Sequence, residues 1–329
     1  MGWLGRAIIA AGASAAGVAG AAWHGGGDYR VAARRVPVLP VGASRVRVLH
    51  ISDEHFVPGN RKLADFVARL ADLGPDLVVS TGDSLASDAA FDAYLRAHRR
   101  LLSVPGVFVF GSNDYFGPVR KNPLRYVIGG HDGLSHGAPL AWERLKEAFE
   151  DAGWVDLTNT SWVTTVGDVS LTLRGTDDAH LGLDDYPRAV KSRSVEPSAR
   201  TEGEAGSTSR IGPATGSHPR TARLGAKSSL NIGVTHAPYL RVLDAMIADH
   251  ISLIFAGHTH GGQVCLPGGR AITTNCDLPV RLASGLHRYR DAWLQVSPGL
   301  GTNPYTPFRL NCPPTACLLD LVSVEAAVA

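Results

Sequence analysis

The sequence predicts an α/β fold, because stretches with strand character alternate with stretches of helical spacing. Strand-like apolar runs occupy residues 46–51, 76–81, 107–110, 230–234 and 251–255. Helical spacing of apolar residues marks residues 61–73, 85–103, 139–152 and 239–249. Each strand-like run also leads into Asp, His or Asn, and α/β sheets build their sites at strand ends. The alternation therefore indicates a layered fold with a site at one edge of its sheets.

The helical stretches differ in the regularity of their apolar faces. The stretch 61–73 carries one apolar stripe, whereas the stripe of 85–103 is looser and includes a histidine. We expect this residue, His98, to lie at the helix surface. Alternating apolar residues at 169–173 and the apolar run 293–296 predict two further strands.

The chain divides into an N-terminal segment, residues 1–35, and one domain, residues 36–329. Its length suits one large α/β domain as well as two smaller ones. Within the domain, residues 187–227 are rich in Ser, Arg, Gly, Pro and Ala and contain no aromatic residue. Such a segment cannot bury enough apolar area to offset its ordering entropy, so we expect a disordered insertion. The net charge of +2 gives no support for nucleic-acid binding, and none is expected.

The N-terminal segment contains an uncharged run, Ala7–Trp23, that is dominated by Ala and Gly. Its length is near the lower limit for a membrane span. The run fits a single membrane anchor in contact with lipid, which we favour, a cleaved signal peptide or a poorly ordered leader. Ala19–Ala21 offers an A-x-A cleavage pattern, while Arg30, Arg34 and Arg35 would oppose export of the C-terminal domain. The expected location is the cell membrane, on a side that these signals leave open.

Side chains of metal-binding type gather after four of the strand-like runs. They are Asp53 and His55, Asp83, His236, and His258 and His260. Two of the groups hold residues two positions apart, which share one side of the exiting chain. Glycines beside the last pair allow a ligand to approach the backbone closely. Each residue alone is more often a cap, a turn residue or an ordinary polar group, but the set as a whole predicts a metal site.

The calcineurin-like metallophosphoesterases have a similar series of motifs in the same order. The motifs here are Asp53-x-His55, Gly82-Asp83, Gly111-Ser112-Asn113-Asp114, His236-Ala237-Pro238 and Gly257-His258-Thr259-His260. The resemblance covers about residues 45–323 apart from the insertion, and the extended last motif is most similar to the membrane-associated bacterial branch typified by YkuE and YaeI. It implies a four-layer αββα sandwich with two mixed β-sheets.

The resemblance also implies two metal ions. One ion would bind Asp53, His55 and His260, the other would bind His236, His258 and an Asn, and Asp83 would bridge them. One motif departs from the family pattern G-N-H-D, in which the Asn is a ligand and the His is catalytic.

This sequence has Ser112 and Asn113 at those two places. Either Asn113 reaches the second metal after a one-residue shift, or Ser112 or water fills the position. We favour Asn113, because an amide oxygen is a competent ligand for a hard metal and a neutral hydroxyl is a poor one. The family's catalytic His then has no counterpart. The catalytic candidates are Asn113, Asp114 and His180, although turn and cap chemistry explains the last two equally well.

Carboxylate, imidazole and amide ligands without thiolate suit Mn²⁺, Fe or Zn²⁺, of which we favour Mn²⁺. Two such ions would hold a bridging hydroxide that attacks phosphorus. The sequence thus predicts hydrolysis of phosphodiesters, phosphomonoesters or pyrophosphates, lipid-linked ones included. Loss of the acid matters least when the leaving group is stable. The alternative is a catalytically weak metal-binding or scaffold protein on this fold, which a metal titration with a chromogenic phosphodiester would distinguish.

The four cysteines leave the redox environment of the protein open. None shows C-x-x-C spacing, so a zinc knuckle is not expected. For an exported domain, the sequence suggests either a Cys276–Cys312 or a Cys312–Cys317 disulfide.

Overall fold

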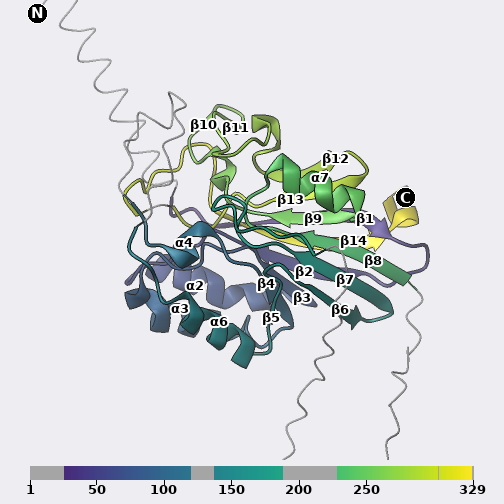
Figure 1. Cartoon of the computed structure of the whole chain (residues 1–329), viewed down its shortest axis with the longest axis horizontal. Coiled ribbons are helices and arrows are strands. Elements are labelled where there is room, and N and C mark those ends of the chain that lie inside the picture. The colour runs from purple at the N-terminus through teal and green to yellow at the C-terminus, as the bar shows by residue number, and fades with distance from the viewer. Residues whose placement is uncertain (1–25, 120–136, 188–227, 303, 328–329) are drawn as a thin grey trace, which may run out of the picture.

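The computed structural model describes residues 26–119, 137–187, 228–302 and 304–327. Two six-stranded sheets, each containing parallel and antiparallel neighbours, form its centre (Figure 1). The mixed α/β class and the two mixed sheets expected from the sequence are therefore confirmed. The predicted insertion, residues 187–227, lies outside the described residues apart from Pro187, and the N-terminal apolar run also lies outside them.

The first sheet has the strand order β1-β14-β2-β3-β4-β5. These strands are β1 (Arg30–Leu39), β14 (Thr315–Ser323), β2 (Val46–Ile51), β3 (Leu77–Ser80), β4 (Gly106–Phe108) and β5 (Val155–Asp156). Strands β2 to β5 run parallel, β1 runs parallel to β14, and β14 is antiparallel to β2. The three apolar runs expected in this half of the chain form β2, β3 and β4.

The second sheet has the order β12-β13-β9-β8-β7-β6. Its strands are β12 (Gly285–Tyr289), β13 (Ala292–Val296), β9 (Leu253–Ala256), β8 (Ser228–Val234), β7 (Val169–Gly175) and β6 (Ser161–Val166). The four central strands are parallel, and β12 and β6 flank them antiparallel. In β7, alternate residues are buried, as the period-2 apolar pattern of 169–173 predicts. A separate hairpin joins β10 (Cys265–Leu266) to β11 (Arg270–Ala271).

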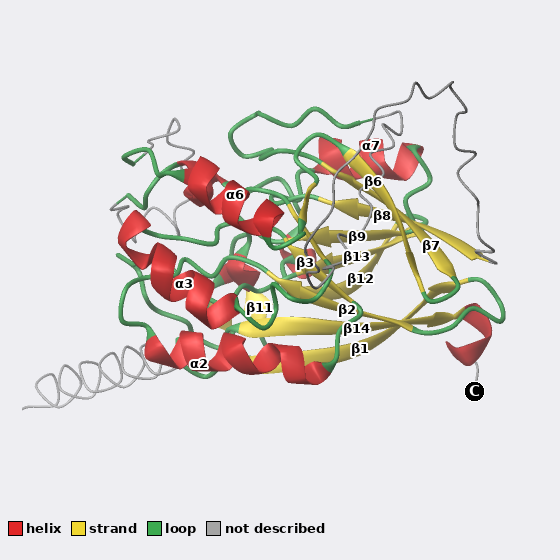
Figure 2. Cartoon of the chain, turned by 90° about the horizontal axis from the view of Figure 1, so that it is seen from below, coloured by secondary structure: helices red, strands yellow, loops and turns green. Residues whose placement is uncertain are grey.

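Helices cover the outer faces of both sheets. The helices are α2 (Arg61–Leu70), α3 (Phe91–His98), α4 (Ser112–Tyr115), α6 (Trp142–Asp151) and α7 (Leu240–Ala248). Short 3₁₀ turns are η1 (Ala71–Leu73), η2 (Asp88–Ala90), η3 (His260–Gly262), η4 (Val280–Leu282) and η5 (Val324–Ala327). Figure 2 shows α2, α3 and α6 together on one side of the molecule. The stretch 85–103 forms only the eight-residue α3 with η2 before it, in keeping with its looser apolar stripe.

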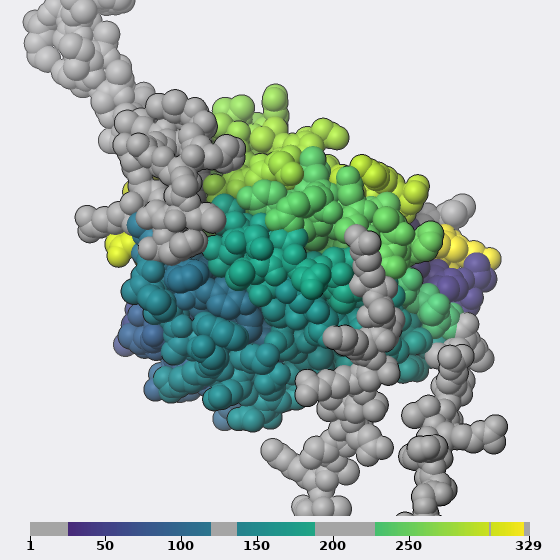
Figure 3. Space-filling view, in the orientation of Figure 1, coloured from purple at the N-terminus to yellow at the C-terminus, as the bar shows by residue number. Residues whose placement is uncertain are grey.

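The apolar side chains form three clusters that hold these layers together. One cluster joins α2, α3 and α6 to the first sheet, a second lies between the two sheets, and a third joins α7 to the second sheet. Strand β2 contributes to two of them, because Leu49 and Ile51 face the helices while Val46 and Val48 face the other sheet. In the space-filling view the N-terminal and C-terminal halves of the described chain are in direct contact (Figure 3).

Strand β1 crosses the domain boundary that the sequence suggests at residue 36. It pairs with β14 from Arg30 onward, and Val36 and Leu39 belong to the cluster between the sheets. The folded sheet therefore includes residues before residue 36. The sequence does not reveal this, because the pairing partner of β1 is a strand near the C-terminus. Among the residues that the structure describes, no helix combines the length and the hydrophobicity that a membrane crossing requires.

The expectation that His98 lies at the helix surface is wrong. Its side chain is 0 % exposed and stacks on Tyr94, with ring centroids 3.8 Å apart. The ring donates from Nδ1 to the Tyr94 carbonyl at 2.8 Å, and its Nε2 lies 3.0 Å from Glu54 Oε1. Both ring nitrogens thus face oxygens, an arrangement that is satisfied when His98 and Glu54 form a buried ion pair or share one proton.

Candidate metal centre

The predicted metal ligands all follow the carboxyl ends of parallel strands. Asp53 and His55 come after β2, and Asp83 comes after β3, its parallel neighbour in the first sheet. His236 follows β8, and His258 and His260 follow β9, again a parallel pair but in the second sheet. The candidate site is therefore assembled where strand ends of both sheets meet, as the sequence pattern indicates.

Five of these residues have left-handed backbone conformations that are uncommon outside glycine. The φ angles are 51° at Asp53, 41° at His55, 56° at Asp83, 69° at His258 and 50° at His260. Such conformations cost on the order of 1–3 kcal/mol each and persist where the surrounding structure imposes them, often at functional sites. Five of the eleven described non-glycine residues with positive φ are therefore residues that the sequence marks as ligands.

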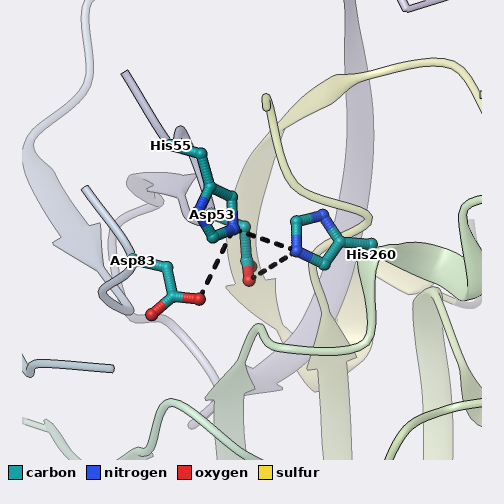
Figure 4. A group of neighbouring side chains, drawn as sticks. All are labelled: Asp53, His55, Asp83 and His260. Atoms are coloured by element: carbon teal, nitrogen blue, oxygen red, sulfur yellow. Dashed lines mark hydrogen bonds and ion pairs between the residues drawn. The ribbon is translucent and has the colours of Figure 1, made fainter. Parts of the chain in front are cut away.

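Four side chains converge in a first cluster, drawn in Figure 4. His55 Nε2 lies 3.1 Å from His260 Nε2 and 3.4 Å from Asp83 Oδ2. His260 Nε2 is also 3.6 Å from Asp53 Oδ1. Their donor atoms all lie within 4.8 Å of one another, which is the arrangement that a single metal ion requires.

A second group of donors lies on the other side of Asp83. His236 Nε2 is 3.6 Å from Asp83 Oδ1, while its Nδ1 donates to the Thr81 carbonyl at 2.6 Å. This hydrogen bond holds the proton on Nδ1 of the neutral ring and leaves Nε2 with a free lone pair. Nε2 is buried and has no hydrogen-bond partner. A buried, unpartnered and oriented imidazole nitrogen fits a metal ligand.

His258 has a similar arrangement. Its Nε2 donates to the Asn275 carbonyl at 3.2 Å, so that Nδ1 carries the free lone pair of the neutral ring. The His258 and His236 rings are 5.2 Å apart and nearly perpendicular. The two histidines expected at the second metal therefore lie side by side, each oriented by a backbone carbonyl.

Asn113 contacts the Asp83 carboxylate that lies between the two groups. The Asn113 backbone N–H donates to Asp83 Oδ1 at 2.8 Å, and its Nδ2 donates to Asp83 Oδ2 at 2.8 Å. Ser112 lies alongside, with its hydroxyl 3.5 Å from Asn113 Nδ2. The structure thus places the Asn113 amide at the shared carboxylate, and its role as a metal ligand stays a prediction.

The charges of the site strongly affect its protonation. Burial by itself would lower the pKa of His236. The charges of three nearby carboxylates outweigh burial and raise this pKa to about 9, and these carboxylates belong to Asp83, Asp53 and Asp178. Burial would likewise raise the pKa of Asp83, but His236 and His55 outweigh it and hold that pKa far below its usual value. A metal ion must displace the His236 proton, so metal binding should weaken as the pH falls below about 9.

Asp53 is held in place by hydrogen bonds to both of its oxygens. The His258 backbone N–H lies 3.0 Å from each oxygen, and the Ser52 hydroxyl donates to Oδ2 at 2.5 Å. The Thr81 hydroxyl in turn donates to Ser52 Oγ at 2.6 Å. A Cβ at Gly257 would overlap both the Ser52 hydroxyl and the Asp53 carboxylate, so only glycine permits this close approach.

The donor set fits two divalent ions. It consists of imidazole nitrogens and carboxylate oxygens with an adjacent amide, and no thiolate takes part, which excludes a structural cysteine site. A match to the family model described as calcineurin-like phosphoesterase extends over residues 46–262. The chain belongs to the calcineurin-like phosphoesterase family. The match spans all of the predicted ligands.

Several proteins are similar to this family member. The uncharacterized protein YpbG of Bacillus subtilis (strain 168) is 25% identical over 228 residues, and the match covers 68% of this chain and 64% of YpbG. TT1561 of Thermus thermophilus matches with a TM-score of 0.35 at 12% identity, over 78% of this chain and 91% of that one. Phosphopantetheinyl hydrolase PptH from Mycobacterium tuberculosis matches with a TM-score of 0.38 at 12% identity, over 83% and 96%. Likenesses this weak say nothing about the substrate.

Asp114, a candidate proton donor, forms hydrogen bonds with the backbone. Its Oδ2 accepts from the N–H groups of Asp83 at 2.7 Å and Gly111 at 2.9 Å, and its Oδ1 accepts from Ser84 at 2.8 Å. Burial, followed by the Asp83 charge, raises the pKa of Asp114 to about 7. These contacts brace the turns that carry Asp83 and Asn113. Turn and cap chemistry therefore describes its contacts, and its role as a general acid stays a prediction.

His180, the other candidate, lies beside the second group of ligands. Its ring centroid is 4.7 Å from that of His258, and its Nδ1 is 3.0 Å from the Tyr239 hydroxyl. The His180 backbone N–H donates to Asp178 at 3.0 Å. The side chain is partly exposed, unlike the His236 ring. The structure thus places His180 beside His258, and its role as a proton donor stays a prediction.

Two buried charged residues of the site escaped the sequence analysis. Glu54 lies between Asp53 and His55 and pairs with His98. Arg309 is 1 % exposed and donates to the carbonyls of Pro298 at 2.8 Å and Gly301 at 2.6 Å, with a longer contact to the His260 carbonyl at 3.4 Å. No local pattern signals a buried arginine, because its carbonyl partners are assembled only by the fold.

Proposed function

We propose that this phosphoesterase works with two divalent metal ions, with Mn²⁺ favoured, held on either side of Asp83. The observation that carries the proposal is the position of this carboxylate. Its Oδ2 lies 3.4 Å from His55 Nε2, and its Oδ1 lies 3.6 Å from His236 Nε2. Each oxygen thus serves a different histidine group, which is what a bridging ligand must do. Two bound ions would supply an activated water and neutralise phosphoryl charge.

Hydrogen bonds within the chain orient the proposed ligands of this centre. The Thr81 and Asn275 carbonyls keep the His236 and His258 lone pairs directed inward, and Ser52 orients Asp53. Phosphoryl oxygens would approach from the side of Asn113 and His180, because these side chains are partly exposed while most ligands are buried.

We further propose phosphodiesters or lipid-linked pyrophosphates as substrates, with the N-terminal run as a membrane anchor. Two observations support this assignment. The motif series resembles the membrane-associated bacterial branch, and the run Ala7–Trp23 is uncharged. Replacement of the family's catalytic histidine favours substrates that need no proton donor. Turnover of a panel of mono-, di- and pyrophosphates, with the full-length chain in detergent or vesicles, tests the substrate class.

Removing metal from the full-length chain is expected to abolish hydrolysis of bis(p-nitrophenyl) phosphate. In the proposed mechanism only the metal ions activate the attacking water. The buried His236 Nε2 also has no hydrogen-bond partner among the described residues, as expected of a metal ligand. Mn²⁺ added to the chelated protein should restore turnover and bind with two equivalents in a calorimetric titration. A proton should be released on binding at neutral pH, because the pKa of His236 lies at about 9 without metal.

His236→Ala is the matched variant for this experiment. It should lower the stoichiometry from two ions to one while the first cluster remains. Undiminished turnover after thorough chelation would contradict the proposal, and a stoichiometry of one in the unaltered chain would exclude a dinuclear centre.

Hydrolysis is expected to depend steeply on the leaving group. If no general acid assists departure, the enzyme should favour aryl over alkyl phosphodiesters more strongly than the uncatalysed reaction does. The additional preference should be on the order of 10²–10⁴-fold. The measurement is kcat/KM over a series of leaving groups, under conditions where chemistry limits the rate.

Similar rates for alkyl and aryl substrates would mean that a general acid exists. His180→Ala is then the first variant to make, because His180 lies beside His258. Asp114→Asn is the comparison, because the backbone amides occupy both Asp114 oxygens. The variant that loses only the alkyl substrate identifies the donor.

A further inference from the structure

Two cysteine thiols meet directly behind the turn that carries His260. Cys265 begins β10, and its N–H donates to the Leu310 carbonyl at 2.9 Å. Asn311 Nδ2 donates back to the Cys265 carbonyl at 3.0 Å, so the two segments run side by side. The same Gly261 carbonyl accepts from Cys265 Sγ at 3.1 Å and Cys312 Sγ at 3.6 Å.

The two disulfides suggested by the sequence are not formed. All four cysteines are free, Cys276 packs at the edge of the α7 cluster, and Cys317 packs between the sheets. The partner of Cys312 is instead Cys265, a residue for which the sequence suggests no partner. Two thiols on neighbouring backbone segments that contact the same carbonyl are candidates for a disulfide.

We propose that Cys265 and Cys312 form a reversible disulfide and that its formation weakens metal binding through His260. The disulfide itself does not depend on the proposed function, but its effect on the metal centre rests on it. Cys312 lines a cavity of about 200 Å³ together with Arg34, Ser284 and Gln295, whereas Cys265 does not line it. A small disulfide such as oxidised glutathione would therefore meet Cys312 first.

The exchange proceeds in two steps. Cys312 loses its proton to solvent, its sulfur bonds to one sulfur of the small disulfide, and the other sulfur leaves as a thiol. The Cys265 sulfur then attacks Cys312 Sγ and displaces the second small thiol. The protein loses two electrons and two protons, and one small disulfide becomes two thiols.

The disulfide would act on the metal centre through the His260 turn. Cys312 Sγ donates to the His260 carbonyl at 3.3 Å, and a Cβ at Gly261 would overlap that sulfur. Oxidation removes both S–H donors and draws the sulfurs to about 2.05 Å from each other. The turn has left-handed backbone conformations at His260, with φ 50°, and at Gly261, with φ 62°. Loss of such supporting contacts typically weakens metal affinity by about 10- to 100-fold.

The first measurement counts thiols in the folded, full-length chain after treatment with oxidised glutathione. We expect two of the four thiols to disappear, with a mass decrease of about 2 Da and no retained glutathione. Peptide mapping should link Cys265 to Cys312. Cys276→Ser is the matched control and should still form the link, whereas Cys265→Ser should not. Four remaining thiols, or a link to Cys276 or Cys317, would overturn the proposal.

The second measurement is Mn²⁺ affinity by calorimetry in the reduced, oxidised and re-reduced chain. We expect affinity about 10- to 100-fold weaker in the oxidised form and recovery after dithiothreitol. Cys276→Ser should respond in the same way. Equal affinities in all three states, with the disulfide formed, would overturn the coupling to His260. A reduced chain that binds no metal would instead contradict the proposed function, while the thiol count still decides whether the disulfide forms.

Discussion

Asp83→Asn is expected to reduce kcat on the order of 10²–10³-fold, and Asn113→Ala on the order of tenfold or less. The Asp83 carboxylate faces His55 with one oxygen and His236 with the other, so its charge serves both proposed ions. Removing a charge shared by two ions costs several kcal/mol of electrostatic stabilisation, and each ~1.4 kcal/mol is a tenfold change in rate. A terminal amide such as that of Asn113 can be replaced by water.

The comparison requires that both variants remain folded and that metal content is measured. Thermal unfolding monitors the first condition, and titration with Mn²⁺ monitors the second. Asp83→Asn should bind fewer than two ions, whereas Asn113→Ala should keep both with weaker affinity for one. Equal losses in two folded variants, or a greater loss in Asn113→Ala, would show that Asp83 is not the bridging ligand.

His98→Ala is expected to lower the free energy of unfolding by about 3–5 kcal/mol. The substitution leaves the Glu54 carboxyl group buried without its imidazole partner, and breaking a buried pair on one side leaves an uncompensated charge. Glu54 Oε2 already lacks a hydrogen-bond partner, so the remaining contact is the long one from the Tyr94 hydroxyl at 3.4 Å. Urea denaturation of the metal-free chain measures the change without interference from bound ions.

Tyr94→Phe is the matched control for this prediction. It removes the long hydroxyl contact to Glu54 and the hydrogen bond with Ser84 but keeps the aromatic ring, and it should cost no more than about 1.5 kcal/mol. The double variant Glu54→Leu, His98→Leu should recover most of the loss, because replacing both members of a buried pair with apolar groups is often nearly neutral. A loss below about 1 kcal/mol in His98→Ala would mean that Glu54 is protonated or that water reaches it.

The local sequence is sufficient to place the strands and the metal-binding residues along the chain. Runs such as 46–51 and 251–255 are mainly apolar because most of their residues are buried, and the structure forms β2 and β9 there. The ligand residues come directly after these strands, in turns whose glycines permit close approach. Both features arise within a few neighbouring residues, so periodicity and spacing can reveal them.

The tertiary structure alone decided how distant segments combine. It paired β1 with β14 across a boundary that looked like a linker, buried His98 against Glu54, and placed Cys265 beside Cys312. It also directed one oxygen of Asp83 toward each histidine group. Each of these contacts joins residues far apart in the chain, and a residue's own neighbours in sequence carry no record of which distant group will satisfy its charge or hydrogen bonds.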